Sequence, residues 1–122
     1  MNHTIAESRA TRRLRRRTAL APAEPLWKRV PLRDADGRLL ADFMMLIPRL
    51  SQRPREQVEQ TVQRLQQVLE RYRHVVVFAD LNLKLNVLWV SVRPAPGICL
   101  ELATAINLLV PEARLVAHRQ HP

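Results

Sequence analysis

The sequence predicts an α+β fold in which two helices cover one face of a four-stranded antiparallel sheet. The chain has 122 residues, of which 47% are apolar, and this length allows one hydrophobic core. Short apolar segments and two segments of helical periodicity follow the order strand, helix, strand, strand, helix, strand. That order contains two crossover connections, and their common handedness puts both helices on the same face of the sheet.

The first half of the domain contains a turn, a strand and a helix. Asp and Gly in residues 34–37 predict a turn, and therefore a hairpin that begins near Val30. Residues 39–47 form an almost continuous apolar run that ends before Pro48, which is typical of a strand covered on both faces. From residue 54 to residue 73, apolar residues recur at steps of four and three, which predicts an amphipathic helix.

The second half is predicted to contain two strands, a helix and a last strand. Residues 74–80 are rich in β-branched and aromatic side chains, as strands are. Because one strand through residue 93 would be too long, we expect a turn at residues 81–84. The remaining predicted elements are a strand over residues 85–93, a helix over residues 98–110 and a strand over residues 114–118.

This order of elements over residues 39–118 resembles the ferredoxin-like superfold. The resemblance implies a fold and no activity, because that fold carries metal carriers, RNA binders, sensing domains and enzymes. Residues 92–98 read Val-Arg-Pro-Ala-Pro-Gly-Ile and are similar to the strand, Pro-Gly, helix step of ACT-type ligand-sensing domains. In that family the step follows the first strand, whereas here it follows the third, so no ligand residue is carried over.

Positive charge is concentrated at the N-terminal end. Residues 1–33 contain nine Lys or Arg and two acidic residues, which gives a net charge of +7. Residues 34–122 contain eleven Lys or Arg and nine acidic residues, which gives a net charge of +2. A Pro/Ala segment at residues 21–25 follows the arginine run. We therefore expect residues 1–28 to be a disordered Arg-rich arm with a linker, and residues 29–122 to be a single domain.

The arm has two interpretations. Closely spaced arginines neutralise phosphates, which predicts salt-dependent binding to nucleic acid without sequence specificity. The alternative is a solvated tail that binds nothing. The candidate nucleic-acid-binding residues are Arg12, Arg13, Arg15, Arg16 and Arg17.

Composition also excludes several classes of protein. No apolar run reaches the ~20 residues of a membrane span, and the arginine run occupies the place where a secretory or twin-arginine signal would have its apolar segment. One cysteine and four scattered histidines do not form a zinc site, and two glycines do not form a phosphate-binding loop. We therefore expect a cytoplasmic protein without a metal or another cofactor.

The sheet face opposite the helices is expected to be unusually apolar. Strand alternation places Asp42, Asp80 and Ser91 on this face, together with Val76, and places Val77 on the opposite face. A large apolar open face usually marks a partner surface, so we expect a homodimer or a protein partner. The alternative is that the segment containing Trp27, Val30 and Leu32 covers part of it. The candidate interface residues are Leu40, Met44, Leu46, Phe78, Val87 and Trp89.

No set of residues predicts a reaction. Cys99 lies near a helix N-terminus, where a thiol can become reactive, but it also belongs to an apolar stripe and is expected to be buried. His118 and His121 have no acidic or thiol companion that would complete a metal site. Asp42 and Asp80 lie on strands that are not neighbours in this fold, so an acid and base pair is not expected. The third strand also lacks the glycine and paired aromatics of an RNA-recognition sheet.

The sequence therefore predicts a non-enzymatic cytoplasmic module that acts as a homodimer or as a subunit of a complex. A small ligand near residues 94–97 is part of this prediction. The first alternative is a nucleic-acid-associated protein that uses its arginine arm. The second is a small dimeric enzyme of unknown reaction, with a pocket around Trp89 and Asp42.

Overall fold

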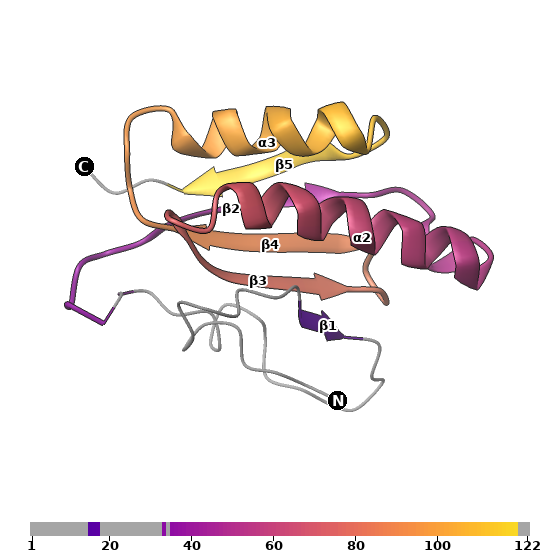
Figure 1. Cartoon of the computed structure of the whole chain (residues 1–122). Coiled ribbons are helices and arrows are strands. Elements are labelled where there is room, and N and C mark those ends of the chain that lie inside the picture. Colours follow the sequence, from indigo (N-terminus) through magenta and orange to yellow (C-terminus); the bar gives the residue numbers. More distant parts are fainter. Residues whose placement is uncertain (1–14, 18–32, 34, 120–122) are drawn as a thin grey trace.

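The computed structural model describes residues 15–17, 33 and 35–119, which form a sheet with two α-helices packed against it (Figure 1). The chain is therefore an α+β protein with four antiparallel strands and two helices, as the sequence predicts. The strands are β1 (Arg15–Arg17), β2 (Ala41–Leu46), β3 (Val76–Asn82), β4 (Val87–Val92) and β5 (Arg114–Arg119). The helices are α2 (Arg55–Arg71), α3 (Ile98–Leu109) and a short 3-10 turn, η2 (Leu50–Gln52).

The strand order across the sheet is β1-β3-β4-β2-β5. The pairs β3 with β4, β4 with β2, and β2 with β5 are antiparallel, whereas β1 is parallel to β3. β1 lies within residues 1–28, the segment expected to be the Arg-rich arm and linker. The rest of the expected arm, with Arg12 and Arg13, lies outside the described residues.

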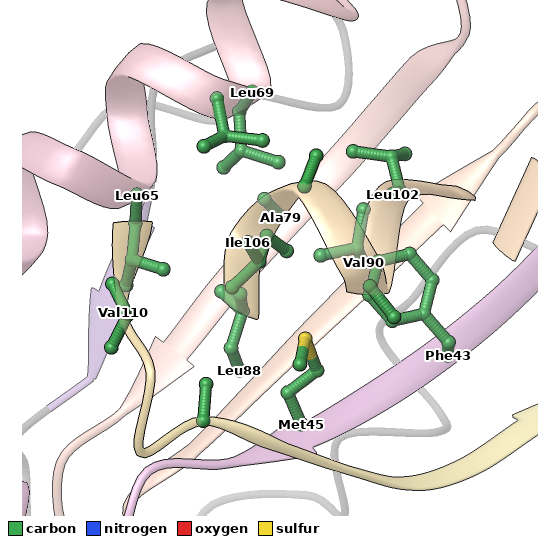
Figure 2. Packing of buried hydrophobic residues seen from close by; sticks show 14 of the residues in the cluster. Phe43, Met45, Leu65, Leu69, Ala79, Leu88, Val90, Leu102, Ile106 and Val110 are labelled. Carbon is green, nitrogen blue, oxygen red and sulfur yellow. The ribbon is translucent and has the colours of Figure 1, made fainter. Parts of the chain in front are cut away.

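Both helices lie on the same side of the sheet and bury one apolar face against it (Figures 1 and 2). α2 begins after Pro54, whose fixed backbone angle suits the start of a helix, and α3 begins after Gly97, which adopts a positive φ of 71°. Both helices begin within one residue of the predicted position. The core between helices and sheet includes Phe43, Met45, Leu65, Leu69, Leu88, Val90, Leu102 and Ile106.

The turn between β3 and β4 lies two residues later than predicted, because β3 extends to Asn82. The Asn82 side-chain oxygen accepts hydrogen bonds from the backbone N–H groups of Lys84 and Leu85, at 2.9 and 3.1 Å. Asn86 completes the turn with a φ of 59°. The predicted N-terminal turn is present in part, since Arg33 and Leu39 form an antiparallel bridge.

A bulge in β3 corrects one prediction about the faces of the sheet. Val76 is opposite Val92, and Phe78 is opposite the next residue of β4, Ser91, so Val77 is an extra residue in β3. The bulge turns Val76 into the core with the helices, whereas simple alternation put it on the helix-free face. Phe78 remains on the helix-free face as predicted.

No helix in the part of the chain that the structure describes is long and apolar enough to cross a membrane.

Candidate functional site

Nine residues of β2, β4 and β3 form a regular array on the sheet face away from α2 and α3. The strand registers align them in three rows of three, with Trp89 at the centre. The rows are Asp42, Ser91 and Phe78; then Met44, Trp89 and Asp80; and then Leu46, Val87 and Asn82.

The six predicted interface residues do not share one environment. Leu40 and Phe78 are only 2% and 1% exposed, so they are already buried within the single chain. The other four residues are half-buried and contiguous, because Met44 pairs with Trp89 and Leu46 pairs with Val87. We call Met44, Leu46, Val87 and Trp89 the Trp89 patch. The alternative cover, the segment with Trp27, Val30 and Leu32, lies outside the described residues.

Polar groups lie among these apolar side chains. Trp89 Nε1 and Ser91 Oγ are buried and have no hydrogen-bond partner within the described part of the chain. A buried indole N–H usually has an acceptor, so the centre of the patch has an unused donor. Asp42 and Asp80 are buried as well, and β4 lies between their strands.

The remaining candidates for chemistry are not assembled into a site. Cys99 is fully buried in the core, and its Sγ lies 3.8 Å from the backbone oxygen of Asp42, so the predicted structural position is confirmed. His118 is exposed on β5, and His121 lies outside the described residues. Among the residues that the structure describes, no group of three or more His, Cys, Asp and Glu side chains could hold a metal. Gly97 and the loop before it are exposed.

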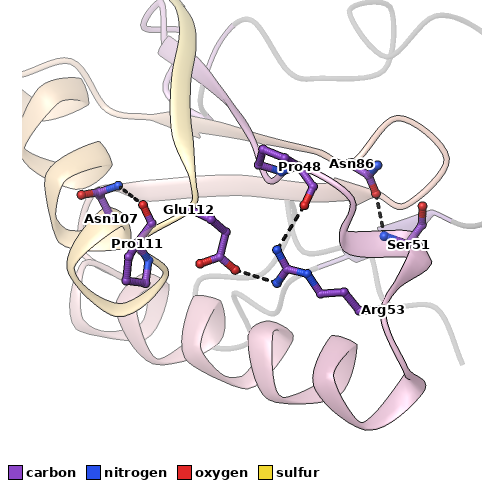
Figure 3. A network of polar contacts seen from close by, with 7 residues as sticks. All are labelled: Pro48, Ser51, Arg53, Asn86, Asn107, Pro111 and Glu112. Atoms are coloured by element: carbon purple, nitrogen blue, oxygen red, sulfur yellow. Dashed lines mark hydrogen bonds and ion pairs between the residues drawn. The ribbon is translucent and has the colours of Figure 1, made fainter.

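A second polar region, which the sequence did not indicate, lies where α2 begins and β5 begins. It is an open depression of about 730 Å³. The Arg53 guanidinium crosses it, donating to Glu112 Oε2 at 2.6 Å and to the backbone oxygen of Pro48 at 3.1 Å (Figure 3). The residues that line it are Pro48, Arg49, Gln52, Arg53, Pro54, Glu112 and Arg114.

The ionisation of Glu112 reflects two opposing effects. Burial alone would raise its pKa, but the hydrogen bond from Arg53 and a backbone hydrogen bond act in the opposite direction, as do the charges of Arg53 and Arg64. The net result is a pKa below the ordinary value of a glutamate. Glu112 is therefore ionised at neutral pH and holds Arg53 as an ion pair.

Two asparagines fix the loops on either side of this ion pair (Figure 3). Asn86 Oδ1 accepts a hydrogen bond from the backbone N–H of Ser51 at 2.8 Å. Asn107 Nδ2 donates to the backbone oxygens of Pro111 and Ala113, at 3.0 and 2.8 Å. Each wall of the depression is thus tied to a neighbouring element by a side chain. No sequence pattern predicts these contacts. They join residues that are distant in the chain, or they join a helix to an irregular loop.

Tyr72 and Glu101 join the C-terminal end of α2 to the first turn of α3. The Tyr72 hydroxyl donates to Glu101 Oε2 at 3.0 Å, and this hydrogen bond, together with partial burial and the glutamate charge, raises the pKa of Tyr72. The Tyr72 ring also stacks on His74, with 6.3 Å between ring centroids. Glu101 and His74 are exposed, whereas Tyr72 is half-buried against the core, and we interpret the group as a helix-to-helix contact.

Comparison of the chain with protein-family models, with curated proteins and with solved structures gives no match.

Proposed function

We propose that this protein is a non-enzymatic association module that pairs with a second copy of itself through the Trp89 patch. The observation that carries the proposal is the contiguous, half-buried apolar surface on the sheet face that neither α2 nor α3 covers. Such surfaces usually serve binding. The framework we propose is ferredoxin-like, which the order β3-β4-β2-β5 of its antiparallel strands supports.

A second copy suits this surface better than an unrelated partner. A two-fold axis near Trp89 would bring two identical sheet faces together, and each would offer the other an apolar area of the same size and shape. Burying the four side chains would remove their remaining exposed apolar area from water.

The compartment and the ligand belong to the proposal as well. A single cysteine, buried as a free thiol, suits a reducing compartment such as the cytoplasm. The sequence also predicts a small ligand near residues 94–97. These residues are exposed, and we propose them as the position at which such a ligand would bind.

The test is the oligomeric state of the full chain, measured by light scattering and sedimentation over a range of concentrations. We expect a dimer for the native chain and a monomer for Trp89→Asp, because a charge at the centre of an interface is left desolvated and unpaired. Leu108→Asp is the matched control, since Leu108 is 76% exposed on α3 and lies away from the patch. A native chain that stays monomeric at high micromolar concentration, or dissociation caused by the Leu108 variant alone, would overturn the proposal.

Nucleic-acid binding through the arginine run is the second candidate. The uneven charge favours it, since residues 1–33 carry a net charge of +7. β1 contains Arg15–Arg17 and pairs with β3 at one edge of the sheet, so these three candidate residues have a defined backbone position. Phosphate contacts from this edge would supply affinity without sequence specificity.

A further inference from the structure

The depression beside the Arg53–Glu112 ion pair has more positive than negative side chains in its lining. Three arginines and one glutamate line it, which gives a net charge of +2. Arg53 is engaged by Glu112 and Pro48. Arg49 and Arg114 are exposed, and their side chains have no hydrogen bond or ion pair with any other residue that the structure describes.

The backbone that carries these arginines is held in a fixed and partly strained shape. Arg49 has φ 61° and ψ 19°, a left-handed conformation that is unfavourable for a residue with a side chain. The next turn is tied to the β3–β4 hairpin by Asn86, and the opposite wall is tied to α3 by Asn107. The backbone of the depression therefore needs little further ordering when a ligand binds, and the side chains of Arg49 and Arg114 are the groups that must become ordered.

The neighbouring charges favour an anion. Pro54 provides no side-chain cap for α2, so the partial positive charge of the helix start adds to that of the arginines. The positive charge of Arg64 also helps to lower the pKa of Glu112. The opposing charges are Glu112, which Arg53 already balances, and Glu56 in the first turn of α2.

We propose that this depression binds a small phosphate-bearing ligand, with Arg49 and Arg114 as the phosphate-binding residues. A phosphate monoester carries close to two negative charges at neutral pH, which matches the net +2 of the lining residues. Guanidinium groups bind phosphate oxygens through paired, charge-assisted hydrogen bonds. Arg53 is a positioning residue, because Glu112 fixes its guanidinium between the two walls. The volume lies within the range of ligand sites, ~300–1,000 Å³.

Calorimetric titration of the full chain with inorganic pyrophosphate, at physiological salt, tests the proposal. We expect saturable binding by the native chain and a loss of about tenfold or more in affinity for Arg49→Gln/Arg114→Gln, since two charged hydrogen-bond donors are removed. The matched control is Arg71→Gln/Lys84→Gln, which removes the same charge at exposed positions outside the depression. Backbone amide signals of Gln52, Arg53 and Glu112 should shift on titration of the native chain.

The controls separate this site from other phosphate binders on the chain. Equal affinities of the two double variants would overturn the proposal, because binding would then follow net charge alone. Absence of saturable binding by the native chain would also overturn it. A parallel titration with a single-stranded oligonucleotide identifies the source of the phosphate. If the depression variant weakens oligonucleotide binding and leaves pyrophosphate binding unchanged, the depression serves nucleic acid and the proposed small ligand is wrong.

Discussion

The ion pair between Arg53 and Glu112 joins two loops that are 59 residues apart in the sequence. Their side chains are 24% and 36% exposed, so solvent weakens the attraction without removing it. We expect Glu112→Gln to lower the free energy of unfolding by about 0.5–1 kcal/mol at pH 7, measured by urea denaturation. Glu70→Gln is the control, because its pair with Arg73 is more exposed, and we expect a smaller change there.

The same pair predicts a dependence on pH. The folded pKa of Glu112 is lowered, so its contribution to stability is complete above the carboxyl pKa of the unfolded chain, about 4.3, and is lost as the pH falls through the folded pKa. The difference in unfolding free energy between the native chain and Glu112→Gln should therefore be largest near pH 7 and should shrink towards pH 3. A difference that stays constant over this range would contradict the assignment.

Asn86 has two functions in the β3–β4 hairpin, and substitutions separate them. Its φ of 59° is a conformation that glycine adopts freely, and its Oδ1 accepts the hydrogen bond from Ser51. Asn86→Gly keeps the backbone shape and loses only the hydrogen bond, whereas Asn86→Ala loses both. We expect the alanine variant to be less stable than the glycine variant by about 1–2 kcal/mol in thermal or urea unfolding. Equal stabilities would show that the backbone conformation has no energetic importance.

At the scale of elements, the described sheet has three interior strands, β3, β4 and β2, and two edge strands, β1 and β5. β2 lies between β4 and β5, and β4 lies between β3 and β2, whereas β5 pairs only with β2 in the described sheet. Interior strands require a larger opening before their amides reach water. In hydrogen exchange we expect the amides of β2 and β4 to be protected longest and those of β5 to exchange sooner. Faster exchange in β2 than in β5 would contradict the strand order.

The helices and strands were predictable because the residues that form the local apolar pattern in the sequence are the same residues that are buried in the structure. Val58, Val62, Leu65 and Leu69 recur at helical spacing, and all four are buried in α2. The prediction of faces failed at Val76, because the extra residue Val77 in β3 reverses the alternation and leaves no mark in the apolar pattern. The turn before Asn86 was misplaced for a similar reason, since Asn82 side-chain hydrogen bonds set its position.

At the scale of the whole molecule, the sites depend on contacts that no local pattern contains. The Trp89 patch was partly predictable, because alternation along β2 and β4 places Met44, Leu46, Val87 and Trp89 on one face. The burial of Leu40 and Phe78 was not predictable, since it depends on the folded chain as a whole. The depression beside the Arg53–Glu112 ion pair was not predictable either, because it forms only when tertiary structure brings the start of α2 next to the start of β5.

The distribution of charge over the whole chain leads to the last prediction, which tests the arginine run independently of the Trp89 patch. If Arg12, Arg13 and Arg15–Arg17 bind phosphates, affinity for duplex DNA should fall steeply with salt, and changing all five to Gln should reduce the slope of log K against log salt by up to about four units. A chain that begins at residue 26 should lose the same slope. It should still fold, because β3, β4, β2 and β5 pair without β1.

The measurement is a fluorescence-anisotropy salt titration of the three proteins with DNA and RNA, with sedimentation of each as the control for assembly. Equal binding by all three would place the phosphate contacts on the folded domain and would show that the arginine run is not the nucleic-acid site.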